Sequence, residues 1–250
     1  MTTTPRLVVA IVLLFAAFPL VPRPVVVAIA LATNALTIVA WRQRAVAAVH
    51  VGLFATLCFA MLATGVVLSQ LWLGVAIIAY ATVVQSVSWL RGTAEWARWG
   101  DFGRHQLLLC LVCAAVAGAS LLVWFVALRP NVDDILATFF PDVSPWLLLI
   151  GAVGFSMVNA AVEEIAYRGV IMFALRSALG AGAVALGLQA VAFGTLHING
   201  FPRGTVGVGL AIIYGLMMGL VREHAGGMLA PWFAHVMTDL TIVTILVLLA

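Results

Sequence analysis

The chain consists of long apolar runs that are separated by short polar breaks. In the N-terminal half these runs cover residues 7–18, 25–40, 46–68, 71–90 and 106–128. A helix that crosses a bilayer needs about 20 mostly apolar residues, so the last three runs predict full spans. The first two are shorter and flank three prolines, without a clean small-residue cleavage site. We therefore expect a helical hairpin that is retained rather than a cleaved signal peptide.

After residue 145 the apolar pattern continues but carries more polar positions. One helix is predicted from Trp146 to about Ala178, followed by a break at Gly180-Ala-Gly182. Further helices are predicted over 184–197, 204–222 and 228–250. Gly215 and Gly219 have the G-x-x-x-G spacing that permits close helix contact. The whole pattern predicts an all-α, polytopic integral membrane bundle of about eight or nine transmembrane helices.

Composition supports a membrane protein and argues against nucleic-acid binding. The chain is 65% hydrophobic and 8% charged, with a mean hydropathy of +1.20, far outside the range of soluble globular domains. No polar stretch is long enough to fold alone. The net charge of +3 comes from arginines, with no lysine. Most arginines lie between apolar runs, where they report topology and contact with lipid head groups.

Charge in the connections predicts the orientation. Arginines are concentrated in two connections, at positions 42, 44, 91, 98 and 104, whereas the connection near residues 129–145 carries Asp133, Asp134 and Asp142. The positive-inside rule places the arginine-rich connections in the cytoplasm. The N-terminus is then inside and the aspartate-rich connection outside. We expect the protein in the cell membrane.

The three cysteines and three of the five histidines are not expected to take part in catalysis. Cys58, Cys110 and Cys113 all lie within apolar runs, so buried packing is favoured over a redox or zinc role. His50, His105 and His224 lie at the ends of runs, beside arginines or turns. We predict that these three histidines lie at the membrane interface.

Ionisable residues inside predicted spans are few and all fall in the C-terminal part. They are Glu163, Glu164, Arg168, His197, His235 and Asp239. Such groups cost about 2.5–3.5 kcal/mol for a central Asp, Arg or Lys and usually have a function. The first 128 residues have none that is clearly in mid-span. We therefore expect residues 1–128 to be scaffold helices and residues 145–250 to hold the site.

The spacing of these residues predicts pairs. Glu164 and Arg168 are four apart, so they share a helix face and can pair. Glu163 lies about 100° further round the helix and has no local partner. It is 17 residues before Gly180, and His197 is 17 after it. An antiparallel hairpin therefore brings Glu163 and His197 to the same depth.

The third pair completes a set that suits activation of water. His235 and Asp239 share one helix face. Glu163 would take the proton from water, and a histidine would stabilise the oxyanion or hold a metal. Glu163, His197 and His235 would be acceptable zinc ligands, although the H-E-x-x-H pattern of zinc proteases is absent. Both a metal-dependent and a metal-free mechanism stay open, with the metal-free one favoured.

Each pair taken alone also has a structural interpretation. Glu164 with Arg168 fits a bridge between helices, and His235 with Asp239 fits a core hydrogen bond. His197, four residues after Phe193, fits a helix-end interfacial residue. Their joint presence in a chain so poor in charge favours a functional site.

The three motifs together resemble a known family. Glu163-Glu164-x3-Arg168, Phe193-x3-His197 and His235-x3-Asp239 are similar to the signature of the CPBP family, also called the Abi family. Its members are the CAAX-protease and bacteriocin-processing intramembrane endopeptidases. The resemblance covers roughly residues 145–250 as a protease core, and the preceding spans are variable in that family.

The resemblance implies a role for each residue. Glu163 would be the base that activates water, and His197 its partner at the scissile carbonyl. Glu164 and Arg168 would orient the site, and His235 with Asp239 would stabilise the oxyanion. The last position is often Asn in the family, so Asp239 is a departure. Its extra negative charge favours a protonated His235 or a bound cation.

We therefore predict an intramembrane endopeptidase that hydrolyses peptide bonds of membrane-associated peptides or proteins. Membrane lipids are the expected surroundings, and no nucleic acid is expected as a partner. The alternative hypotheses are a non-proteolytic membrane scaffold or immunity protein of the same fold, and a proton-coupled transporter that uses the same buried acids. The transporter is disfavoured because the polar groups have no counterpart in the other half.

Overall fold

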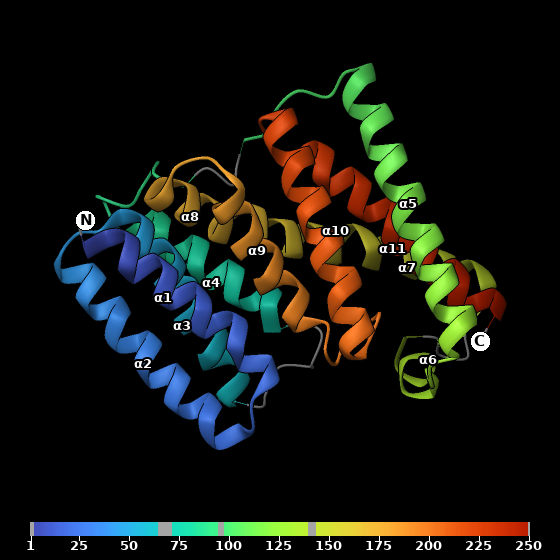
Figure 1. Cartoon of the computed structure of the whole chain (residues 1–250), viewed down its shortest axis with the longest axis horizontal. Coiled ribbons are helices and arrows are strands. Elements are labelled where there is room, and N and C mark those ends of the chain that lie inside the picture. Colours follow the sequence, from blue (N-terminus) through green and yellow to red (C-terminus); the bar gives the residue numbers. More distant parts are fainter. Residues whose placement is uncertain (1–2, 65–71, 95–97, 140–143, 250) are drawn as a thin grey trace.

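A computed structural model describes residues 3–64, 72–94, 98–139 and 144–249, and within these ranges the regular structure is entirely helical (Figure 1). The N-terminal half contains α1 (Thr3–Ala17), the short 3-10 helix η1 (Phe18–Leu20), α2 (Arg23–Arg42), α3 (Val46–Thr64), α4 (Trp72–Ser86) and α5 (Arg104–Leu128). The C-terminal half contains α6 (Asp133–Phe139), α7 (Pro145–Glu164), the π-helix η2 (Ile165–Ile171), α8 (Met172–Leu179), α9 (Ala183–Leu196), α10 (Gly204–Ala225) and α11 (Leu229–Leu249).

Six helical segments among the described residues are long and apolar enough to cross a membrane. They are 23–42, 46–63, 104–128, 146–179, 204–225 and 229–248. Three shorter apolar helices accompany them, over 4–20, 72–86 and 183–196. The predicted all-helical class is confirmed, and these six segments are candidate membrane spans. The number of eight or nine crossings stays a prediction, because three of the nine apolar segments are shorter than a span.

The helices form two groups that meet at α9. In Figure 1, α1 to α4 and α8 lie on the left, α5, α10 and α11 lie on the right, and α9 runs between them. Close approach of α9 and α10 depends on the predicted glycine pair. A Cβ added at Gly215 would lie 3.0 Å from Ala190 Cα, and one added at Gly219 would lie 2.4 Å from a methyl of Leu186. The G-x-x-x-G prediction of close helix contact is confirmed.

Glycines also end the two helices that lead into tight turns. Gly180 follows α8 with φ +82°, and Gly226 follows α10 with φ +65°. Both angles lie in the region that residues with a Cβ adopt at a cost. The predicted helix breaks near these positions are confirmed. The hairpin between α8 and α9 is the one that was expected to bring Glu163 and His197 to one depth.

Two details of the structure go beyond the sequence-based expectations. A short helix, α6, lies in the aspartate-rich connection, for which no helix was predicted. His50, which we predicted at the membrane interface, is fully buried among the helices. Its Nδ1 lies 2.5 Å from the Tyr80 hydroxyl and its Nε2 2.8 Å from the Thr93 hydroxyl. Hydrogen bonds at both ring nitrogens compensate its removal from water.

Other expectations were met or fall outside the described residues. Cys110 and Cys113 are free and buried, and the Cys110 thiol contacts the Ala230 carbonyl at 3.2 Å. The predicted packing role of these cysteines is confirmed. The Ser69-Gln70 break and Asp142 lie outside the described residues.

Candidate active site

The helix that carries the paired glutamates changes its winding directly after them. α7 ends at Glu164 and continues as the seven-residue π-helix η2, which then passes into α8. The Met172 N–H donates to the Tyr167 carbonyl, five residues earlier. Such π segments occur often at functional sites. This winding places the Glu164 and Arg168 side chains in the bundle interior while Glu163, on α7, reaches a cavity.

Arg168 and Glu164 form a buried ion pair. Their Nη1 and Oε1 atoms are 2.9 Å apart and both side chains are at most 1% exposed. Arg168 also donates to the Gly215 carbonyl at 3.3 Å, and its guanidinium lies 4.7 Å from the centroid of the Phe193 ring. Gln189 donates to the same carbonyl at 2.8 Å. The pair therefore links η2 to both α9 and α10, as expected of a supporting group.

His235 lies among three carboxylates. Its Nδ1 is 2.7 Å from Glu164 Oε1. An ionised carboxylate can only accept, so Nδ1 carries the proton and the ring is fixed in orientation. The opposite nitrogen, Nε2, lies 3.6 Å from Glu163 Oε2 and 3.6 Å from Asp239 Oδ1. Glu164 thus orients His235, whose Nε2 faces the two other carboxylates.

Asn159 is a member of this cluster that the sequence analysis missed. Its amide Nδ2 donates to Asp239 Oδ2 at 3.1 Å. It lies on α7 one turn before Glu163, and both side chains line the same cavity. A neutral amide in an apolar run carries no charge signal. Its position four residues before Glu163, on the same helix face, was the signal that could have identified it.

His197 approaches from another wall. It directly follows α9, and its ring stands 4.7 Å from the Phe193 ring in a tilted arrangement. Its Nδ1 lies 3.1 Å from the Phe193 carbonyl oxygen, which can only accept, so Nδ1 is the protonated nitrogen. In the neutral ring Nε2 then keeps its lone pair. His197 therefore presents a hydrogen-bond acceptor from the end of α9.

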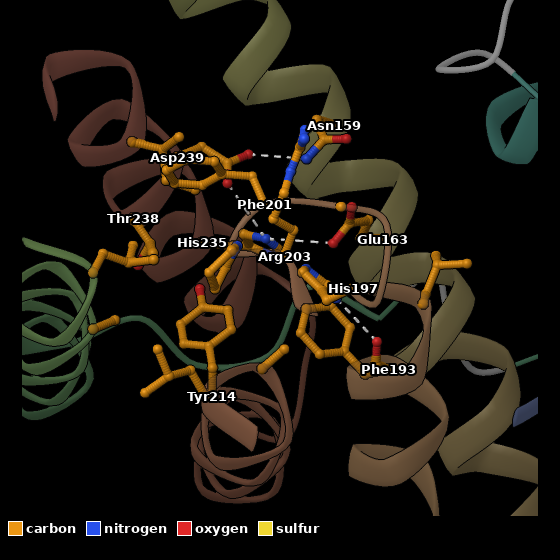
Figure 2. Close-up of a pocket in the computed structure, with 18 of the residues that line it drawn as sticks. Asn159, Glu163, Phe193, His197, Phe201, Arg203, Tyr214, His235, Thr238 and Asp239 are labelled. Atoms are coloured by element: carbon orange, nitrogen blue, oxygen red, sulfur yellow. Dashed lines mark hydrogen bonds and ion pairs between the residues drawn. The ribbon is translucent and has the colours of Figure 1, made fainter. Parts of the chain in front are cut away.

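A single cavity of about 970 Å³ connects these groups. Figure 2 shows Glu163, His197, His235 and Asp239 around it, with Arg203 and Tyr214 also labelled. Glu164 and Arg168 do not line it and lie behind His235. The structure therefore brings four of the six predicted residues to one cavity and places the other two as their support.

The candidate metal ligands do not form a ligand set. No group of three or more His, Cys, Asp or Glu side chains within the described ranges is arranged to hold a metal ion. Glu163 Oε2 and His235 Nε2 are 3.6 Å apart, close enough for both to reach one ion, but among the described residues no third side chain completes a set with them. Zinc would need nitrogen and oxygen ligands that converge at about 2.0–2.2 Å from one point. The arrangement does not fit zinc held by Glu163, His197 and His235.

Comparison with known proteins agrees with the motif pattern. Residues 145–241 match the family model described as type II CAAX prenyl endopeptidase Rce1-like. This segment belongs to the CPBP family. All six predicted site residues lie within the CPBP segment, and the family implies an intramembrane peptidase of the CAAX-protease type. The identification made from the three motifs is confirmed. No curated protein and no solved structure matches the chain.

Proposed function

We propose that the chain is an intramembrane endopeptidase whose catalytic centre is the cavity between Glu163, His197, His235 and Asp239. The observation that carries this proposal is the convergence of these four side chains from α7, α9 and α11 on one cavity. An ion pair and a hydrogen bond behind the cavity hold His235 in place. A polar centre this ordered in an apolar bundle is typical of a functional site.

In the proposed reaction, Glu163 is the general base. A water molecule between Glu163 and His197 would donate one hydrogen to the Glu163 carboxylate and the other to His197 Nε2. Its oxygen then attacks the carbonyl carbon of the scissile bond. Glu163 holds the proton and passes it to the leaving amine. A positioned base of this kind contributes about 10²–10⁴-fold to the rate.

His235 is proposed to stabilise the oxyanion. In its protonated form it donates from Nε2, and Asp239 and Glu163 at 3.6 Å balance its charge. Asn159 restrains Asp239 through the hydrogen bond at 3.1 Å. Loss of one oxyanion donor lowers kcat by about 10²–10³-fold.

The rest of the chain fits a membrane-embedded peptidase. We assign residues 1–128 as scaffold and residues 145–250 as the protease core in the cell membrane. Beyond the polar centre the cavity is lined mostly by apolar side chains, such as Leu148, Phe155 and Ile213. Walls of this kind favour peptides with apolar side chains that are associated with the membrane.

The test compares catalytic and structural effects. Glu163→Gln and His197→Gln should each lower cleavage of a membrane-tethered reporter at least about 100-fold. Folded yield, measured by size-exclusion chromatography in detergent, should stay at the wild-type level. Glu223→Gln is the control, because the Glu223 side chain is 30% exposed and does not line the cavity. Full activity in both cavity variants would reject catalysis by this site. So would a fall in folded yield with unchanged activity per folded molecule, a result that favours a scaffold.

A further inference from the structure

One end of the bundle gathers the connections between several helices. The segment before α5 is hydrogen-bonded to the turn between α10 and α11, from the Met228 N–H to the Arg98 carbonyl and from the Asp101 N–H to the Ala225 carbonyl, both at 2.8 Å. An ion pair of 3.6 Å between Arg176 and Glu223 places the end of α8 there too. These connections follow the upper edge of Figure 1. We call this the arginine end.

The arginine end carries most of the positive charge. Eight arginines lie there, at positions 6, 42, 44, 91, 98, 104, 176 and 222, and Arg168 is buried in the interior. The other three of the twelve arginines, Arg23, Arg129 and Arg203, lie at the opposite end. Short connections rich in arginine face the cytoplasm. The arginine end is therefore the cytoplasmic end.

The cavity extends from the catalytic groups toward the opposite end. Its lining includes η1 at Phe18 and Pro19, the start of α4 at Trp72, α6 at Ile135 and the α9–α10 connection at Phe201. The ring centroids of Phe18 and Trp72 are 6.3 Å apart, so η1 and the start of α4 are neighbours there. They lie along the lower edge of Figure 1. None of the eight arginines of the arginine end lines the cavity. We call this the cavity end.

We infer that the catalytic cavity opens on the non-cytoplasmic side of the membrane. Its substrates are then membrane-anchored peptides or proteins whose scissile bond lies at the outer surface, with apolar side chains beside that bond. The substrate class rests on the proposed peptidase function. The sidedness rests only on the positions of the arginines and of the cavity.

Two serines allow the orientation in the membrane to be measured without an activity assay. Ser144 precedes α7 at the cavity end, and Ser177 lies in the last turn of α8 at the arginine end. Both are exposed, and they bracket one continuous helical segment. Ser144→Cys and Ser177→Cys would be exposed to a membrane-impermeant maleimide in intact cells, with wild type as control for the buried native cysteines. Ser144→Cys should be labelled at least tenfold more than Ser177→Cys, and permeabilisation should remove the difference. The reverse pattern overturns the inference.

Paired reporters test the substrate class. A single-span anchor would carry the same cleavable segment on its outer or on its cytoplasmic side. We expect cleavage of the outer reporter only, and loss of this cleavage in Glu163→Gln. Glu163-dependent cleavage of the cytoplasmic reporter, alone or together with the outer one, overturns the sidedness and leaves the peptidase intact. If neither reporter is cut, the proposed function fails, while maleimide labelling still decides the orientation.

Discussion

Replacing Glu164 with alanine should destabilise the fold, because this carboxylate is a partner of two buried cationic or donor groups. Its Oε1 lies 2.9 Å from Arg168 Nη1 and 2.7 Å from His235 Nδ1. Both of these side chains are at most 4% exposed, so water cannot replace the lost partner. Arg168 would keep only the Gly215 carbonyl and the face of Phe193.

The magnitude follows from the burial of the pair. Removing one partner of a buried ion pair costs about 3–5 kcal/mol, since it leaves an uncompensated charge. For a chain of this size each kcal/mol shifts Tm by about 2–4 °C, which gives a fall of about 6–20 °C. The matched control is Glu223→Ala. Its pair with Arg176 is 3.6 Å long and about a third exposed, and such pairs contribute about 0–1 kcal/mol.

The difference in Tm is measured by heating the purified variants in detergent and then determining the folded fraction by size-exclusion chromatography. We expect Glu164→Ala to unfold well below wild type and Glu223→Ala to unfold within a few degrees of it. Equal shifts of Tm in Glu164→Ala and Glu223→Ala would refute the structural role that we assign to Glu164. Glu163→Gln should unfold like wild type, because Glu163 lies at the cavity.

Three further outcomes are expected. Gly194→Ala should lower the free energy of unfolding by about 1–3 kcal/mol, since the added Cβ would lie 2.9 Å from backbone atoms of α10. The control is Gly187→Ala on the same helix, whose Cβ meets nothing within 4 Å. This control should be neutral or slightly stabilising in the same unfolding assay. Asn159→Ala should lower kcat for the reporter about tenfold without loss of folded yield, because Asp239 loses its hydrogen-bond donor. Asp239→Asn can still accept this hydrogen bond through its amide oxygen, so the same kinetics should stay within about tenfold of wild type. Because the candidate ligands do not converge on one point, cleavage should persist after chelation with EDTA, and loss of activity that stoichiometric zinc restores would contradict this expectation.

Much of the helix pattern could be predicted from the sequence because apolar length and glycine breaks are local signals. The break at Gly180 and the long helix before it appear at nearly the predicted positions. The depth argument from that turn agrees with the structure, which brings Glu163 and His197 to one cavity. The family could also be identified, because three spaced motifs are rare in a chain with so few charges.

Other features depend on tertiary contacts and left no local signal. Apart from Arg168, the π-helix η2 has a mostly apolar sequence that a regular α-helix would fit equally well. The hydrogen bond of Asn159 links positions 80 residues apart. The burial of His50 depends on Tyr80 and Thr93, two residues of distant segments that hydrogen-bond to its ring nitrogens. The location of the cavity opening also required the helices to be assembled.

The central claim is that Glu163 activates water for peptide hydrolysis within the cavity. The most direct measurement is cleavage of a membrane-tethered reporter by the purified protein in proteoliposomes, with wild type and Glu163→Gln compared at equal folded amounts and the products identified by mass spectrometry. The account predicts one defined cut by wild type and at least about a 100-fold loss in the variant. Equal cleavage by both proteins would contradict it.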